Sequence, residues 1–145
     1  MPAFPPDEPA PSDGRYHRSG HEWPLYGTLE PETAWAEWSA ATRGAVDPAG
    51  VIRSLWQLEV VDLPVIDLRD PEARGALGVG IEDLTGSWSA CQPLADRARE
   101  IGALGMVVPS AARPDAWNLL VFRGGLAHLR VAGRSVGHPA VSAIR

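Results

Sequence analysis

The chain contains no lysine: all 13 of its basic residues are arginine, against 18 acidic residues, and the formal net charge is -5. The absence of lysine excludes Schiff-base chemistry on a lysine amine and the lysine-containing loop of P-loop nucleotide-binding proteins. The arginines form no basic cluster along the sequence, and a protein that grips a nucleic-acid backbone needs clustered positive charge. Nucleic acid is therefore not expected to be a direct substrate.

Cysteine is almost absent as well, since Cys91 is the single one. One cysteine cannot form an internal disulfide, and no signal-like segment opens the chain, so these features predict a cytoplasmic protein. No run approaches the roughly 18 apolar residues that a membrane span needs, and no membrane association is expected. Cys91 has no partner in a metal-binding pattern and is expected to be a buried structural thiol.

Several common motifs are missing. The four histidines belong to no H-E-x-x-H or C-x-x-C set, so no metal site is predicted. The glycines at 75, 78 and 80 are loosely spaced and follow a predicted helix, whereas a dinucleotide-binding fingerprint joins a strand to a helix. Ser110 lacks the G-x-S-x-G setting of a nucleophile elbow, which leaves a hydrolase triad as a weak alternative.

What is present is typical of one globular domain: 145 residues, of which 45% are hydrophobic and 21% charged. Residues 1–13 contain five prolines among small and acidic residues, and this composition predicts a disordered proline-rich arm. Residues 14–145 show no further linker and no internal repeat. They are expected to form a single folded domain.

The order of predicted elements does not follow a regular strand–helix alternation. Hydrophobic periodicity and turn residues predict strands over 24–28, 55–61, 65–68, 106–108, 118–122 and near 127–131, and helices over 31–42, 72–77 and 89–101. A doubly wound parallel sheet requires that alternation. The sequence therefore predicts an α+β or mixed α/β fold.

The helix predicted over 31–42 carries one acidic residue beside its apolar stripe. The stripe is expected to comprise Ala34, Trp35, Trp38 and Ala41. At about 100° per residue, Glu37 lies about 60° from Ala34, on the border of the stripe. A carboxylate at this position can face a cleft.

Four polar residues stand at the ends of apolar elements: Arg15, Tyr26, Glu37 and Ser110. Taken singly, each has an ordinary structural explanation, such as a surface charge, a core aromatic, a solubilising helix residue or a turn former. Their order along the chain is more informative than any one of them.

The chain resembles the RES domain family, named for its Arg, Glu and Ser. The residues that carry the resemblance are Gly14-Arg15-Tyr16-His17-Arg18, Leu25-Tyr26, Glu32-Thr33-Ala34-Trp35-Ala36-Glu37, Val65 to Pro71, Leu94 to Gly102, Gly105 to Ser110 and Asn118 to Phe122. The ordered series covers nearly all of the predicted folded part. No single segment is specific alone.

The resemblance implies an ADP-ribosyltransferase-like mixed sheet core with flanking helices. It also implies a toxin of a bacterial toxin–antitoxin pair that consumes NAD as its substrate, by hydrolysis or phosphorolysis, with no required cofactor. The implied partner is an antitoxin, expected to be a helix-turn-helix DNA-binding protein. A homodimer is implied by the resemblance alone.

The resemblance also assigns roles to individual residues. Glu37 would stabilise the positive charge that develops on the ribose as nicotinamide leaves. Arg15 would bind the pyrophosphate, with Arg18 as an alternative. Tyr26 would stack on nicotinamide or orient the ribose, and Ser110 would hold either Glu37 or the carboxamide. Asn118 completes the expected NAD-binding set, together with Arg15, Arg18, Tyr26 and Ser110.

Two departures from the family pattern leave alternatives open. The spacing from Arg15 to Tyr26 is one residue longer than expected, so Arg15 and Arg18 both remain candidates for the phosphate-binding arginine. Position 35 is Trp, so the second carboxylate of a Glu-x-Glu motif is absent. This absence favours NAD breakdown over protein ADP-ribosylation, while an inactive RES-like binding module is the remaining alternative.

Overall fold

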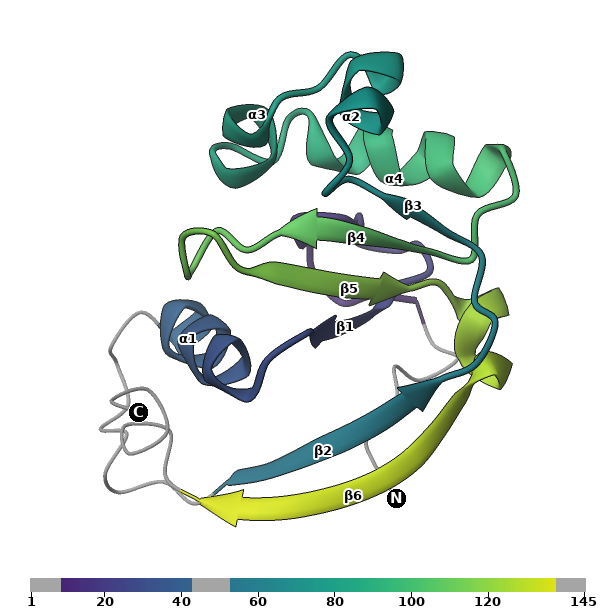
Figure 1. Cartoon of the computed structure of the whole chain (residues 1–145). Helices are drawn as coiled ribbons and strands as arrows, with labels where there is room; N and C mark the ends of the chain where they lie inside the picture. The colour runs from purple at the N-terminus through teal and green to yellow at the C-terminus, as the bar shows by residue number, and fades with distance from the viewer. Residues whose placement is uncertain (1–8, 43–52, 138–145) are drawn as a thin grey trace.

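The computed structural model describes residues 9–42 and 53–137, in which strands form two separate sheets (Figure 1). Along the chain the elements are β1 (Leu25–Thr28), α1 (Pro31–Thr42), β2 (Arg53–Val60), β3 (Val65–Asp67), α2 (Pro71–Leu77), α3 (Ile81–Thr85), α4 (Cys91–Glu100), β4 (Gly105–Pro109), β5 (Trp117–Val121), the 3-10 helix η2 (Arg123–His128) and β6 (Leu129–Gly137). The expected α+β class is confirmed.

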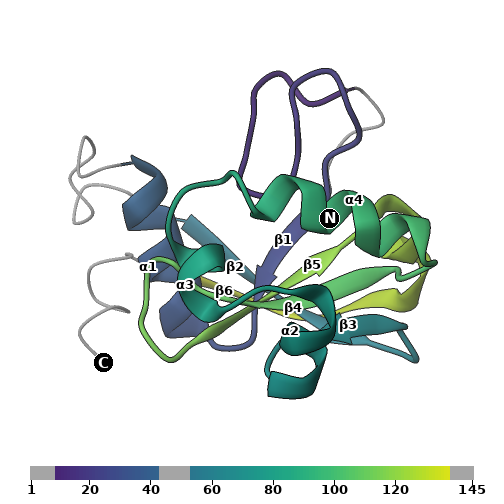
Figure 2. The ribbon, with the colours of Figure 1, turned by 90° about the horizontal axis from the view of Figure 1, so that it is seen from above.

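The larger sheet has the strand order β1-β5-β4-β3. β5 pairs with β1 and with β4 in antiparallel orientation, whereas β3 and β4 are parallel. A parallel pair needs a crossover connection, and α2, α3 and α4 provide it. Seen from above, these three helices lie across one face of the sheet (Figure 2).

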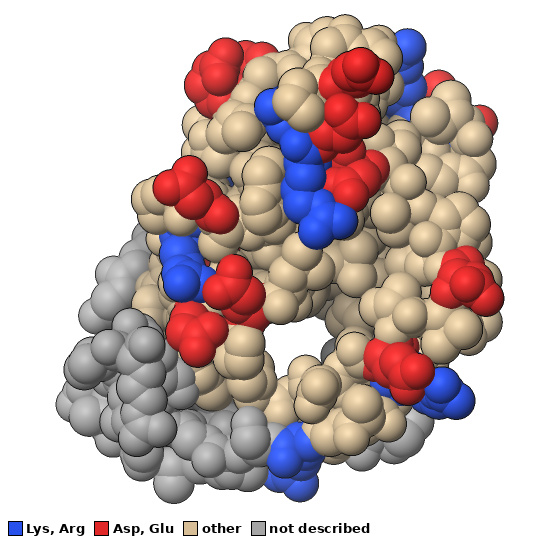
Figure 3. All heavy atoms as spheres, in the orientation of Figure 1, with Lys and Arg blue, Asp and Glu red and all other residues tan. Residues whose placement is uncertain are grey.

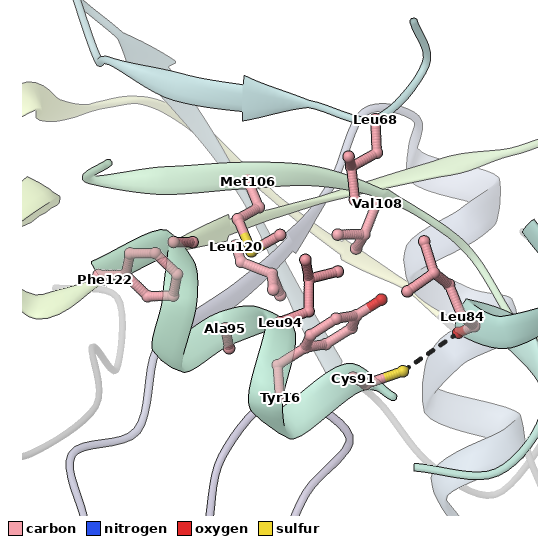
Figure 4. Packing of buried hydrophobic residues seen from close by; sticks show 11 residues of the cluster. Tyr16, Leu68, Leu84, Cys91, Leu94, Ala95, Met106, Val108, Leu120 and Phe122 are labelled. Carbon is pink, nitrogen blue, oxygen red and sulfur yellow. Dashed lines mark hydrogen bonds between the residues drawn. The ribbon is translucent and has the colours of Figure 1, made fainter. Parts of the chain in front are cut away.

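The core lies between α4 and this face of the sheet (Figure 4). It comprises alternate residues of β4 and β5, the inner face of α4 and side chains from the segments around them: Met106, Val108, Leu120, Phe122, Leu94, Ala95, Ala98, Cys91, Leu68, Leu84 and Tyr16. Cys91 is 0% exposed, as expected of a structural thiol, and its sulfur lies 3.6 Å from the Leu84 carbonyl oxygen. The sheet face that packs on α4 is therefore firmly anchored.

The smaller sheet, which we call the ribbon, consists of β2 and β6 alone. The two strands pair in antiparallel register from Arg53 opposite Gly137 to Val60 opposite Leu129, with one irregularity between Gln57 and Leu58. The ribbon stands away from the four-stranded sheet in Figure 1, and the space-filling view shows an opening beside it (Figure 3). Arginine and acidic side chains are interspersed over this face, without a large patch of one sign.

Three local expectations differ from the structure. α3 was not predicted, because a helix of five residues is too short to show periodicity. The strand expected near 127–131 begins only at Leu129, because η2 occupies 123–128, where Gly125 approaches Leu104: an added Cβ would lie 2.6 Å from its carbonyl oxygen. Residues 9–13 fall in the expected disordered arm, yet Ala10 is 2% exposed and its backbone bonds to His21 and Gly20.

Candidate functional site

Glu37 lies half-buried on α1, and its carboxylate is held by one oxygen. Oε1 accepts hydrogen bonds from Ser110 Oγ at 2.6 Å and from Asn118 Nδ2 at 2.9 Å. Within residues 9–42 and 53–137, Oε2 has no hydrogen-bond donor. The two donors fix the orientation of the carboxylate and leave Oε2 as the oxygen that can meet a substrate.

Ser110 is 4% exposed, and its hydroxyl makes one hydrogen bond as donor and two as acceptor. Its Oγ accepts from the backbone N–H groups of Ala112 at 3.2 Å and Arg113 at 3.1 Å. Because these two N–H groups occupy the lone pairs of the hydroxyl oxygen, the O–H of Ser110 is the donor in its hydrogen bond with Glu37. No described histidine forms a hydrogen bond with Ser110, so the arrangement is that of a residue that holds a carboxylate and not that of a serine nucleophile.

The strand register brings Tyr26, Ser110 and Asn118 to one face of the sheet. Asn118 lies opposite Thr28 on β1 and Val108 on β4, and Tyr26 lies opposite Leu120. Directly paired residues, and alternate residues along a strand, project from the same face. Tyr26 and Asn118 are thus diagonal neighbours, and Ser110, two residues beyond Val108, continues their face.

Asn118 has a determined side-chain orientation. A carboxylate only accepts hydrogen bonds, so the atom that contacts Glu37 is the amide nitrogen, and Oδ1 points elsewhere. Oδ1 is buried and has no partner in the described part of the chain. Asn118 therefore donates to Glu37 through Nδ2, while Oδ1 accepts no hydrogen bond from the described residues.

The buried residues of α1 differ from the predicted stripe. Its buried residues are Thr33 and Trp35, while Ala41 is exposed. Thr33 and Glu37 are four residues apart and therefore share a face of the helix. The hydrogen bonds on this side of α1 join Thr33 to Arg113 and Glu37 to Ser110, and apolar periodicity does not reveal them.

Arg113 connects the loop that carries Ser110 to the helix that carries Glu37. Its Nη1 donates to Thr33 Oγ1 at 2.9 Å and to Glu30 Oε2 at 3.1 Å. The same residue donates its backbone N–H to Ser110 Oγ. The loop and α1 are thus joined at two points, one turn of helix apart, which restrains the position of Glu37 over the sheet.

Tyr26 presents an exposed ring and an enclosed hydroxyl. The residue is 45% exposed, but its oxygen lies 2.7 Å from His17 Nδ1 and accepts the Tyr16 N–H at 3.2 Å. Desolvation is the largest cause that raises the pKa of Tyr26 to about 12. The phenol is therefore neutral at physiological pH.

The two candidate arginines occupy different surroundings. Arg15 donates through Nη1 to the carbonyls of Leu84 at 3.1 Å and Gly86 at 2.8 Å, at the C-terminal end of α3. Arg18 forms an ion pair with Asp96 on α4. Arg15 immediately precedes Tyr16, the residue whose N–H contacts the Tyr26 hydroxyl.

Two cavities flank these residues. One, of about 120 Å³, is lined by the charged and imidazole groups His17, Arg18, His21, Glu22, Asp96 and Arg99. The other, of about 360 Å³, lies between α3 and the β4–β5 loop and is lined by Ile81, Thr85, Pro109, Ser110, Ala111, Pro114, Asp115, Ala116 and Trp117. Ser110, which donates to Glu37, thus lines the larger cavity, whereas Glu37 is not among the lining residues of either one.

Of the predicted site residues, Glu37, Ser110 and Asn118 are in direct contact, and Tyr26 shares their sheet face. Arg15 and Arg18 form no hydrogen bond with any of these four. Sequence reasoning missed Thr33, Arg113 and His17. Thr33 stands one helical turn before Glu37 and His17 lies inside the Arg15-to-Arg18 segment, whereas nothing in the sequence singles out Arg113.

The described residues contain no group of three or more His, Cys, Asp or Glu side chains that could hold a metal ion. None of the helices in this part of the chain is both long and apolar enough to span a bilayer. The site consists of protein hydrogen-bonding groups around a carboxylate.

A mixed sheet with flanking helices, and a carboxylate on the helix after the first strand that accepts hydrogen bonds from Ser110 and Asn118, define a mixed α+β protein with a candidate carboxylate site. The chain belongs to the RES domain family, whose family model matches residues 1–139.

Two relatives illustrate how far the similarity extends. The chain is 33% identical over 134 residues to a Mycobacterium tuberculosis protein named "Probable NAD(+) phosphorylase Rv3189", covering 91% of this chain and 64% of that protein. It is 40% identical over 58 residues to "NAD(+) phosphorylase MbcT" of Mycobacterium bovis, covering 39% of this chain and 31% of that one. The chain thus spans under two thirds of the length of these curated relatives.

A solved structure has the same fold. The crystal structure of the Mycobacterium tuberculosis MbcT–MbcA toxin–antitoxin complex matches with a TM-score of 0.72 and 26% sequence identity. The match covers 89% of this chain and 74% of that chain.

Proposed function

We propose that the chain is an NAD-degrading toxin that cleaves the bond between nicotinamide and ribose. The observation that carries this proposal is the Glu37 carboxylate, fixed through Oε1 by Ser110 and Asn118 while Oε2 lacks a described donor. The names of the relatives, both NAD(+) phosphorylases, support the same substrate.

The geometry supports a role for Glu37 in stabilising charge. As nicotinamide departs with the bonding electron pair, positive charge develops on the ribose, and a carboxylate beside the ring stabilises it. Nicotinamide is neutral once released, so its departure requires no strong general acid. Glu37 is held before the substrate arrives, so no reorganisation is needed during the reaction.

We propose phosphate as the acceptor. Its oxygen would form a bond to the ribose carbon that nicotinamide leaves, giving free nicotinamide and an ADP-ribose phosphate. Arg15, Arg18, Tyr26, Ser110 and Asn118 are the candidates for contacts to NAD, and Arg15 and Arg18 are the cations among them. Water as the acceptor is the competing outcome, and the phosphate dependence of the rate separates the two.

We also propose that an antitoxin silences the chain, because the matching solved structure is a toxin–antitoxin complex. A helix-turn-helix antitoxin is the expected kind. Co-purification of this chain with the product of an adjacent open reading frame tests this proposal.

The experiment for the catalytic proposal is nicotinamide release from NAD by the purified chain, with and without phosphate. Glu37→Gln keeps the shape and removes the charge, and we expect the rate to fall about 10³-fold. Glu32→Gln, in the first turn of the same helix, is the matched control and should retain the wild-type rate. Equal rates for Glu37→Gln and the wild-type chain would remove the mechanism.

A further inference from the structure

The Tyr26 hydroxyl is the first group in a chain of hydrogen bonds that continues through His17 to Ser12. Its oxygen lies 2.7 Å from His17 Nδ1, and His17 Nε2 lies 3.0 Å from the Ser12 carbonyl oxygen. A carbonyl only accepts, so Nε2 carries the imidazole proton and Nδ1 is the acceptor. The Tyr26 hydroxyl therefore donates a hydrogen bond to His17 Nδ1.

These contacts occupy the hydroxyl and leave the ring accessible. The phenol has a single O–H, which donates a hydrogen bond to His17, and its oxygen accepts one from the Tyr16 N–H. The His17 ring meets the rings of Tyr26 and Trp23 edge-on, with centroid distances of 5.7 Å and 6.1 Å. His17 is thus held in place itself, and the exposed part of Tyr26 is its ring.

We propose that His17 is a positioning residue that holds Tyr26 so that the aromatic ring, and not the hydroxyl, meets the substrate. This inference rests on the proposed function and narrows it, because the ring would stack on the nicotinamide of NAD. Before the bond breaks, that ring carries a positive charge, and a cation over a tyrosine face is stabilised. The ring lies on the sheet face that carries Asn118, the partner of Glu37.

The charge state of His17 agrees with this role. Desolvation lowers the pKa of His17 below its ordinary value of 6.5, and Arg99 acts in the same direction, while the Ser12 carbonyl and Asp13 raise it. The groups that face it are Asp13, Arg18, His21 and Glu22 of its own segment, Asp96 and Arg99 of α4, and Tyr26 of β1. The imidazole is neutral at pH 7, and its protonation in acid removes the acceptor of Tyr26.

A double-mutant cycle on the KM for NAD tests the inference. Tyr26→Phe and His17→Leu break the same hydrogen bond, so each should raise KM about threefold, and the double variant should raise it no further. Tyr26→Leu removes the ring and should raise KM about tenfold, with kcat changed less than KM. His17→Asn offers an acceptor oxygen near the Nδ1 position and should recover most of the loss, without the rise in KM that the wild-type chain shows in acid.

Two results would overturn the inference. A Tyr26→Phe effect much larger than that of His17→Leu, or effects that multiply in the double variant, would mean that the hydroxyl touches the substrate. Nitrogen-15 NMR of the unliganded wild-type chain reads the imidazole tautomer directly, and a proton on Nδ1 in place of Nε2 would contradict the hydrogen-bond order even if His17→Leu fails to fold.

The NMR measurement needs no activity, so it separates this inference from the proposed function. If the wild-type chain releases no nicotinamide, NAD cleavage is refuted, and the same cycle is then measured on the Kd for NAD. A tenfold weaker Kd for Tyr26→Leu would sustain the stacking role, whereas an unchanged Kd, or no NAD binding at all, would refute it.

Discussion

The four-stranded sheet and the ribbon are both hydrogen-bonded sheets, but they differ in what covers them. Every residue of β4 is buried, and Leu120 of β5 is 0% exposed beneath α4. In the ribbon, Val60 is 42% exposed and Val131 is 43% exposed. A two-stranded sheet without a covered apolar face gains little beyond its own ladder. The candidate site residues on strands, Tyr26 and Asn118, both belong to the covered sheet. A buried and well-packed sheet can hold the partners of a carboxylate in a fixed geometry, which an exposed ribbon cannot do as well.

The largest expected difference between the two sheets is the response to core truncation. Leu120→Ala should lower the free energy of unfolding by about 2–5 kcal/mol, because it leaves a cavity under α4. Val131→Ala, the matched change on the ribbon, should cost less than about 0.5 kcal/mol because the side chain already meets solvent. Urea denaturation measures both, and equal losses would show that the ribbon is covered in solution.

Ser110→Ala tests whether the hydrogen bond from the covered sheet to Glu37 holds this carboxylate in its reactive orientation. The change removes the 2.6 Å donor to Oε1, and we expect nicotinamide release to slow about 10²-fold. Ser54→Ala is the matched control on the ribbon, where the hydroxyl accepts from Arg134. A similar slowing by Ser54→Ala would mean that the ribbon also supports the site.

Thr33→Val addresses the attachment of α1 to the sheet. The two side chains have the same shape, but valine cannot accept the 2.9 Å hydrogen bond from Arg113, so we expect unfolding free energy to fall by about 1 kcal/mol. Thr42→Val removes a bond within the last turn of the same helix and serves as the comparison. An effect of Thr33→Val no larger than that of Thr42→Val would indicate that the Arg113 contact does not hold α1.

The smallest effect is expected for the ion pair across the ribbon. Arg130 and Glu59 are 2.9 Å apart, with side chains 65% and 54% exposed. Exposed pairs of this kind contribute about 0–1 kcal/mol, and salt screens them. Arg130→Gln should therefore change the melting temperature by about 4 °C or less. A larger loss that persists in 1 M salt would show that the pair is shielded, contrary to the exposed ribbon described above.

The sequence was most informative about helix ends, because the residues that start and stop a helix lie next to it in the chain. The predicted bounds of α1 agree with the structure, because Pro31 and Glu32 mark its start. The helix expected over 72–77 is α2, which begins one residue earlier at Pro71; the Asp70 side chain accepts the Glu72 N–H, and Gly78 ends the helix with a φ of 71°. Such caps depend on neighbouring residues only, so they can be recognised from the sequence.

The sequence was least informative where distant segments decide the outcome. The pairing of β2 with β6 depends on partners far along the chain, and so does the hydrogen bond from Arg113 to Thr33 of α1. Arg113 could not be identified, because its contacts with Glu30 and Thr33 join residues about 80 positions apart. The roles of Arg15 and Arg18 in NAD binding stay predictions.

The hydrogen bonds to Glu37 also determine when the site can form. Ser110 lies 73 residues from Glu37 along the chain, and Asn118 lies 81 residues from it. Contacts between such distant residues close a long loop and form late relative to local structure. A chain still emerging from the ribosome carries the helix with its carboxylate long before both donors exist, so the charge remains without a fixed orientation until β5 has been synthesised and has joined the sheet.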